Sequence, residues 1–321
     1  MPFYLRAILD LFLPRECLAC GCRLGLRERH LCLSCAADVP YTYHWLSAHN
    51  PLADRFNAVL ERHRPADERM DYAYAVALMH YKGPCRAIPR ALKYHGNLAA
   101  GRFYGGLLGR RLATAPHFAD VDLIIPVPLH WTRRRSRGYN QAEILAQAIC
   151  DAFCHSEESE GVCYCHSEET EGRRKNLPSS VQCRTDILFR ARRTRTQTKL
   201  TIEQKARNVA SAFQVSFAPS RRDATPHPQH DQTPHPLLDA LLRPWLDALR
   251  HSRLDALRHS RLDRESPQET LARARHILIV DDTFTTGATL YACYAALRPY
   301  TSARISIATL AAVEGTPSSG P

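Results

Sequence analysis

The chain has 321 residues, of which 45% are hydrophobic and 23% charged, and its 43 Lys and Arg outnumber 32 Asp and Glu to give a formal net charge of +11. This composition can bury a substantial core, so it excludes a wholly disordered chain and indicates a globular protein of roughly two domains with room for unstructured inserts. The basic excess favours anionic partners such as nucleotides, phosphates or nucleic acid, although many soluble proteins without such partners carry one.

The first 14 residues are apolar but include Arg6 and Asp10 and end at Pro14. A bilayer span needs about 20 predominantly apolar residues, and no small-residue cleavage site follows. We therefore expect a short amphipathic helix here. No later stretch is long enough to cross a membrane, and we expect a cytoplasmic protein.

Four of the twelve cysteines form two CxxC pairs in the stretch CLACGCRLGLRERHLCLSC, namely Cys17, Cys20, Cys32 and Cys35. In a cytosolic chain such cysteines are more often ligands or buried thiols than disulfides. Two CxxC turns can direct four thiolates at one point, a set that suits structural Zn²⁺. Unligated thiols or a redox CxxC are the alternatives, and Cys22 is a fifth thiol without a CxxC partner. We predict a module over residues 1–45 that combines the amphipathic helix with a zinc site.

Strand-like and helix-like patterns alternate from about residue 70 onward. We predict strands at 71–81, 121–128, 277–280 and 303–313, and helices at 85–97, 101–115, 140–153 and 291–300. Asn140 stands three positions before Glu143, which is typical of a capping box at a helix start. Alternating strands and helices predict an α/β domain over residues 46–316, with a mostly parallel sheet covered by helices on both faces.

Two segments interrupt this alternation and contain direct repeats. Residues 154–182 hold CHSEESEG and CHSEETEG, and LDALRHSR occurs twice in succession within 217–270. We interpret both as surface inserts without chemistry. The alternative for the first insert is a second metal site, built from Cys154, His155, Cys163, Cys165 and His166.

The stretch ILIVDDTFTTGATL carries the chemistry, because Asp281 and Asp282 follow a buried strand at the edge where open α/β sheets bind ligands. These carboxylates can accept hydrogen bonds from the two hydroxyls of a ribose or reach Mg²⁺ through water. The amides and hydroxyls of the next turn can hold a monophosphate. Together they predict a ribose 5-phosphate site at Asp281, Asp282, Thr283, Thr285, Thr286, Gly287, Ala288 and Thr289.

Several blocks resemble known families. ILIVDDTFTTGAT is similar to the phosphoribosyl pyrophosphate (PRPP) signature of type I phosphoribosyltransferases. IIPVPLHWTRRRSRGYNQAEILA, YKGPCRAIPRALKYHGN and RTRTQTKLTIEQKARNVASAF resemble blocks of the ComF family of competence-associated proteins, which also carries a four-cysteine module ahead of this fold. The resemblance covers nearly all of the chain outside the two inserts. The departures are those inserts and Tyr139, where the family often has Phe.

The resemblance implies that PRPP binds with Mg²⁺ and that a cationic group contacts the pyrophosphate, carried here by Lys93, Arg137, Gly138, Asn140 and Gln141. A solvated basic loop is the alternative for the arginine-rich stretch, and a helix-dipole partner is the alternative for Lys93. The basic block 190–199 is either a lid over the sugar or a groove for a nucleic-acid backbone.

Two functions remain open from the sequence. The first is a ComF-like, PRPP-binding protein of DNA uptake and natural competence, which binds single-stranded DNA and works with other DNA-uptake proteins. The second is a phosphoribosyltransferase of nucleotide salvage, which transfers ribose 5-phosphate from PRPP to a nucleobase and releases pyrophosphate. No base-specific pocket is recognisable in the sequence, so enzymatic activity is left open.

Overall fold

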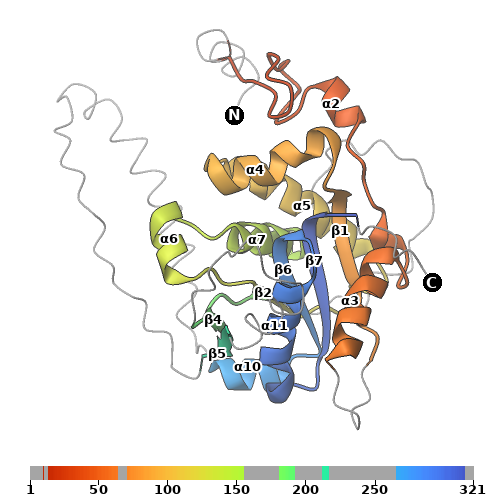
Figure 1. Ribbon diagram of the computed structural model, residues 1–321, viewed down its shortest axis with the longest axis vertical. Coiled ribbons are helices and arrows are strands. Elements are labelled where there is room, and N and C mark those ends of the chain that lie inside the picture. Colours follow the sequence, from red (N-terminus) through yellow and green to blue (C-terminus); the bar gives the residue numbers. More distant parts are fainter. Residues whose placement is uncertain are drawn as a thin grey trace, which may run out of the picture. The chain divides into compact units, whose positions relative to one another are not determined.

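The computed structural model describes residues 10, 14–63, 71–154, 181–191, 212–216 and 265–314 (Figure 1). The chain divides into two compact units, residues 1–216 with 271–321 and residues 217–270. Nearly all described residues belong to the first unit. The expected N-terminal helix, most of both repeat-containing inserts and most of the block 190–199 lie outside the described residues.

A five-stranded sheet forms the centre of the first unit, with the strand order β1-β7-β6-β2-β3. Every pairing in it is parallel, which confirms the predicted α/β class. Its strands are β1 (Ala75–His80), β2 (Leu123–Pro126), β3 (Gln182–Cys183), β6 (His276–Phe284) and β7 (Arg304–Ala312).

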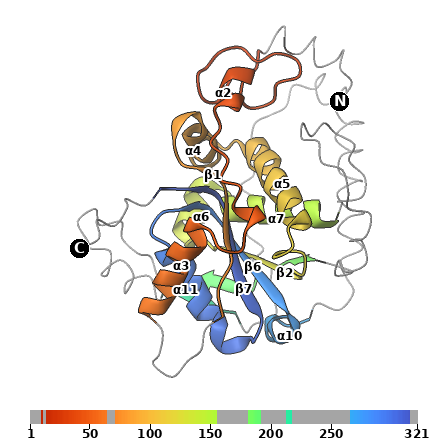
Figure 2. The same cartoon turned by 90° about the vertical axis from the view of Figure 1, so that its right-hand side faces the viewer.

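Helices cover both faces of the sheet, so its central strands are apolar on both sides (Figure 2). On β6, Leu278 and Val280 join one buried cluster, whereas Ile277 and Ile279 join the other. This double burial explains why the run reads as continuous hydrophobic sequence rather than as an alternating strand. The first face carries α4 (Ala87–Tyr94), α5 (Leu98–Thr114) and α7 (Gln141–Cys154), and the second carries α3 (Pro51–Arg62) and α11 (Ala288–Leu297).

Several shorter elements complete the described part of the chain. They are α2 (Leu33–Ala37), η1 (His44–Leu46), η2 (Gly83–Arg86), α6 (Trp131–Arg137), an antiparallel pair β4 (Leu188–Arg190) and β5 (Phe213–Val215), α10 (Pro267–Arg273) and η4 (Arg298–Tyr300). The sequence reading did not predict α3, α6 or the β4–β5 pair. Among the helices of the described residues, none has the length and hydropathy that a membrane crossing requires.

Glycines on one side of α5 let it approach α7 closely. A Cβ atom on Gly109 would lie 2.7 Å from Cβ of Ala152 and 2.8 Å from Cα of Ile149, and one on Gly105 would lie 3.0 Å from Cβ of Ala148. The distances at Gly109 are shorter than carbon atoms tolerate, so a side chain there would push the helices apart, and the distance at Gly105 leaves a side chain only a tight fit. This close packing of α5 against α7, called here the helix seam, fixes the position of α7. The first residues of α7 face the carboxyl edge of the sheet.

Helix α3 is fixed to the sheet through the residue that caps it. The side-chain Oδ1 of Asn50 accepts hydrogen bonds from the N–H groups of Leu52 and Ala53, at 3.1 and 3.0 Å. Its Nδ2 donates to the carbonyl of Ala75 on β1, at 3.0 Å. One buried side chain thus satisfies the helix start and sets the position of α3 against β1.

The N-terminal cysteine module packs against α5. Cys17, Leu24 and Leu31 belong to the same buried cluster as the α5 residues that face the sheet. The His30 ring centroid lies 5.3 Å from that of Phe103 and 6.0 Å from that of Tyr104. The module therefore shares its apolar core with the α/β domain.

Candidate functional site

Strand β6 extends past its neighbour β2 at the carboxyl edge of the sheet. Pro126 at the end of β2 pairs with Val280, whereas the β6 residues from Asp281 to Phe284 continue beside β7 alone. From β2 the chain passes to α7 on one face, and from β6 it passes to α11 on the other. Asp281 and Asp282 therefore lie where the strand order reverses, the position at which open α/β sheets form their binding crevice.

The two carboxylates have different surroundings. Asp282 is buried, and its Oδ2 lies 2.8 Å from Nζ of Lys93 at the end of α4. The Asp281 carboxylate accepts the N–H of Asp282 at 2.8 Å. Burial, followed by repulsion from Asp282, raises the pKa of Asp281 to about 7. One acid is thus held as an ion pair, while the other is ionised only at and above neutral pH.

Cationic side chains converge on these acids from separate segments. Burial lowers the pKa of Lys93, but attraction to Asp282 outweighs burial and the net change is upward, so Lys93 stays charged. Arg190 at the end of β4 interacts electrostatically with Asp281 and with Arg133 of α6, and its pKa is lowered chiefly by burial. This edge of the sheet therefore combines two carboxylates, which can accept hydrogen bonds from hydroxyl groups, with cations that can contact an anionic ligand.

The predicted phosphate turn leads directly into α11. Thr285 and Thr286 are exposed, while Gly287 has a φ of 78° and forms the N-cap of the helix. A Cβ atom at Gly287 would lie 3.0 Å from the Phe284 ring and would need a strained backbone, so glycine is required. The turn presents exposed hydroxyls beside the amides of a helix start, which is the geometry that binds phosphate.

Arg55 on α3 fixes this turn from the other side, a role that the sequence did not indicate. Its Nη2 donates to the carbonyl of Thr285 at 2.8 Å, and its Nη1 donates to that of Val313 at 2.6 Å. The guanidinium carbon lies 5.1 Å from the Phe284 ring centroid. Arg55 thereby ties the start of the phosphate turn to the chain just after β7.

Lys93 lies on α4, and the other predicted pyrophosphate residues lie at the end of α6 and the start of α7. Arg137 ends α6, and Gly138, with a φ of 81°, caps that end, so these two residues do not lie at a helix start. Asn140 precedes α7, where its side chain accepts from the N–H of Ala142 and donates to the carbonyl of Val127. The N–H of Val127 in turn donates to Val280, the neighbour of Asp281.

Gln141 begins α7 and is 3% exposed. Within the described residues its Nε2 atom has no hydrogen-bond partner. A buried donor left unsatisfied costs about 1–3 kcal/mol. An anionic ligand at the start of α7 would satisfy it.

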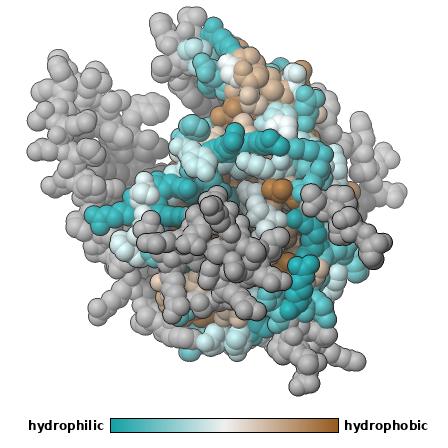
Figure 3. All heavy atoms as spheres, in the orientation of Figure 1, coloured by the Kyte–Doolittle hydropathy of each residue, from teal (hydrophilic) through white to brown (hydrophobic). Residues whose placement is uncertain are grey.

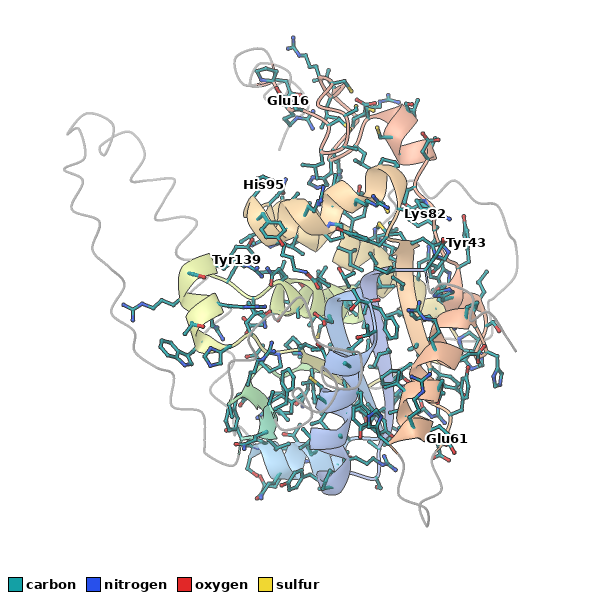
Figure 4. All side chains as sticks on the ribbon, in the orientation of Figure 1. Glu16, Tyr43, Glu61, Lys82, His95 and Tyr139 are labelled. Carbon is teal, nitrogen blue, oxygen red and sulfur yellow. The ribbon has the colours of Figure 1, made fainter. Side chains whose placement is uncertain are left out.

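Helix α6 presents a basic, aromatic surface next to this crevice. Trp131 is 66% exposed, and Arg133, Arg134 and Arg135 are exposed as well. Around the position of α6, several of the described residues in view are hydrophilic (Figure 3). Tyr139, labelled in Figure 4, follows α6, and its hydroxyl donates to the carbonyl of Leu92, which ties this turn to α4.

The cysteine module brings its thiols together. Glu16, labelled in Figure 4, directly precedes Cys17 and forms an isolated antiparallel β-bridge with Arg23. Four sulfur atoms lie within 4.8 Å of one another, those of Cys17, Cys20, Cys22 and Cys32. Three of these are predicted ligands. The fourth predicted ligand, Cys35, interacts through its thiol with Cys32, Cys20 and Cys17.

The geometry of this cluster suits a tetrahedral metal. The sulfurs of Cys20 and Cys32 are 3.7 Å apart, close to the spacing of about 3.8 Å that Zn–S bonds of about 2.3 Å produce in a tetrahedron. Burial opposes ionisation of Cys17, but backbone N–H donors, led by those of Cys20 and Cys32, lower the pKa of its thiol to about 6. The cluster could therefore hold Zn²⁺.

No family model matches the chain. The chain is 25% identical over 211 residues to Competence protein F of Haemophilus influenzae, and the match covers 64% of this chain and 78% of that protein. Together with the cysteine cluster, this relative confirms the resemblance to the ComF family.

Proposed function

We propose, from the similarity to Competence protein F, that this ComF-like protein binds PRPP at the carboxyl edge of its sheet. The observation that carries the proposal is the junction of β6 and α11, where two adjacent acids precede a hydroxyl-rich turn at a helix start. Few ligands fit both parts of this junction, because the two acids suit a pair of neighbouring hydroxyl groups and the turn suits a phosphate group. A ribose carrying a 5-phosphate does so.

Different residues at this site contact different parts of PRPP. Asp281 and Asp282 accept the ribose hydroxyls, and Thr285, Thr286 and the amides from Gly287 onward hold the 5-phosphate. Lys93 leaves Asp282 and turns to the pyrophosphate, where Gln141 donates its side-chain amide. Mg²⁺, when bound, neutralises charge on the pyrophosphate oxygens.

The test is a calorimetric titration of the purified protein with PRPP and Mg²⁺, with inorganic phosphate as a second ligand. The double variant Asp281→Asn with Asp282→Asn should lose PRPP binding, whereas Asp151→Asn on the far part of α7 should keep it. Wild-type protein that does not bind PRPP, or a double variant that binds it normally, would refute the proposal.

A second function, binding of single-stranded DNA, is favoured by the surface of α6. Exposed arginines attract a phosphate backbone, and an exposed tryptophan among them gives a base a ring on which to stack. Trp131 and its three neighbouring arginines supply both features on one short helix. The formal charge of +11 adds long-range attraction to such a partner.

DNA binding can be measured by fluorescence anisotropy of a labelled oligothymidine at increasing salt. Affinity should fall steeply with salt, and Trp131→Ala should raise Kd by roughly tenfold or more. Tyr300→Ala removes an exposed aromatic ring on η4 and is the matched control, which should bind as wild type does. Equal weakening by both variants, or salt-independent binding, would argue against this surface.

Incubation with PRPP, Mg²⁺ and each nucleobase separates this function from nucleotide salvage. Release of pyrophosphate with one particular base would establish a phosphoribosyltransferase. PRPP binding without pyrophosphate release from any base would support the DNA-associated function.

A further inference from the structure

The cysteine module holds one more thiol than a tetrahedral metal requires. Cys17, Cys20, Cys22 and Cys32 form a compact group of four, and Cys35 contacts three members of that group. Four-coordinate zinc uses four sulfurs, so the module offers five candidate ligands for four positions.

Cys22 and Cys35 each interact with members of the remaining trio, although only Cys22 lies in the group whose sulfurs are all within 4.8 Å of one another. The Cys22 thiol interacts with those of Cys20 and Cys32, and the Cys35 thiol interacts with the same two and with that of Cys17. Cys17, Cys20 and Cys32 are further connected by backbone donors, since the N–H of Cys32 points to the Cys17 sulfur at 3.3 Å. Either remaining thiol can therefore complete a tetrahedral set with this fixed trio.

We propose that Cys22 and Cys35 alternate as the fourth zinc ligand, while Cys17, Cys20 and Cys32 remain bound. This inference rests on the proposed metal site. In the exchange, the incoming thiol loses its proton and forms a Zn–S bond. The outgoing thiolate breaks its Zn–S bond and takes up a proton, so charge and coordination number are conserved. The module thereby always keeps one free thiol beside the metal.

Alkylation of the wild-type protein tests this directly. Metal content is measured first, and the protein is then treated with iodoacetamide and mapped by mass spectrometry. Cys22 and Cys35 should each be labelled partially, with the two fractions adding to about one per zinc, since four of five thiols are bound at any time. Cys154, an exposed cysteine on α7, serves as the positive control for labelling.

Cobalt-substituted variants give an independent reading. Cys22→Ser and Cys35→Ser should each keep the absorption of a tetrathiolate site, whereas the combined variant should lose about one quarter of its thiolate charge-transfer intensity.

Wild-type protein without bound metal would overturn the metal site and this inference together. A metal-loaded protein labelled at only one of the two cysteines, or one single variant that already loses the tetrathiolate spectrum, would overturn the exchange alone.

Discussion

Replacing Asp281 with Asn should stabilise the folded protein at alkaline pH while weakening sugar-phosphate binding. The wild-type carboxylate is enclosed beside Asp282, so ionising it in the folded state is unfavourable. Asparagine has the same shape, keeps an oxygen to accept the N–H of Asp282, and never ionises. The substitution thus removes an electrostatic cost without removing the backbone contact.

The size of the effect follows from the pKa of Asp281, which rises from 3.8 to about 7 on folding. Such a difference corresponds to on the order of 4 kcal/mol. Because the folded pKa is the higher one, wild-type stability from this group is intact below about pH 4 and is lost as pH rises toward about 7. The advantage of Asp281→Asn should grow over that window and then level off.

Urea unfolding of both proteins between pH 4 and pH 8 measures this advantage. Asp282→Asn is the informative control, because it removes the carboxylate that pairs with Lys93 and should destabilise the fold at neutral pH. A difference between wild type and Asp281→Asn that does not change with pH, or a variant less stable than wild type at pH 8, would show that the carboxylate is not strained.

Three other predictions follow from the packing. Arg55→Met should raise the Kd for PRPP by about tenfold or more, as calorimetry would show, because the phosphate turn loses a charged hydrogen bond; unchanged affinity would remove Arg55 from the site. Gly109→Ala should destabilise the protein by about 1–3 kcal/mol through overpacking, whereas Gly106→Ala on the open side of α5 should stabilise it by up to about 1 kcal/mol, and equal effects in urea unfolding would contradict the helix seam. Asn50→Ala should cost about 2 kcal/mol, and a variant with wild-type Tm would show that its three hydrogen bonds contribute little.

Strands β1, β2, β6 and β7 were predictable from the sequence because their burial makes them largely apolar, whereas the short strands β3, β4 and β5 were not predicted. The apolar run before Asp281 contains no polar residue, and β7 is buried at every position after Arg304, as a sheet covered on both faces requires. Helix α6 was not predictable in this way, because its sequence consists largely of exposed arginines and has no apolar residues at helical spacing. Helix α3 does have apolar residues at helical spacing, namely Leu52, Phe56 and Leu60, so this helix is predictable from the sequence.

The two acids and the hydroxyl-rich turn after them can be recognised from the sequence because they are contiguous in the chain, and their binding of a sugar phosphate stays a prediction. Arg55 was not, since it meets Thr285 across 230 positions and nothing local distinguishes it from any helical arginine. The sequence did not indicate that Cys22 joins the thiol cluster, for a related reason. Spacing identifies CxxC turns, but which thiols meet depends on how the two turns fold onto each other.

The contact between the cysteine module and α5 bears on how the protein can be dissected. Phe103 and Tyr104 are covered by His30 and its neighbours. A truncated form that starts at α3 would therefore expose an apolar surface of α5 to water. Such fragments should aggregate, so a loss of function in them would say little about the role of the cysteine module that was removed. Point substitutions in the intact chain are the sounder way to test the two proposed functions separately.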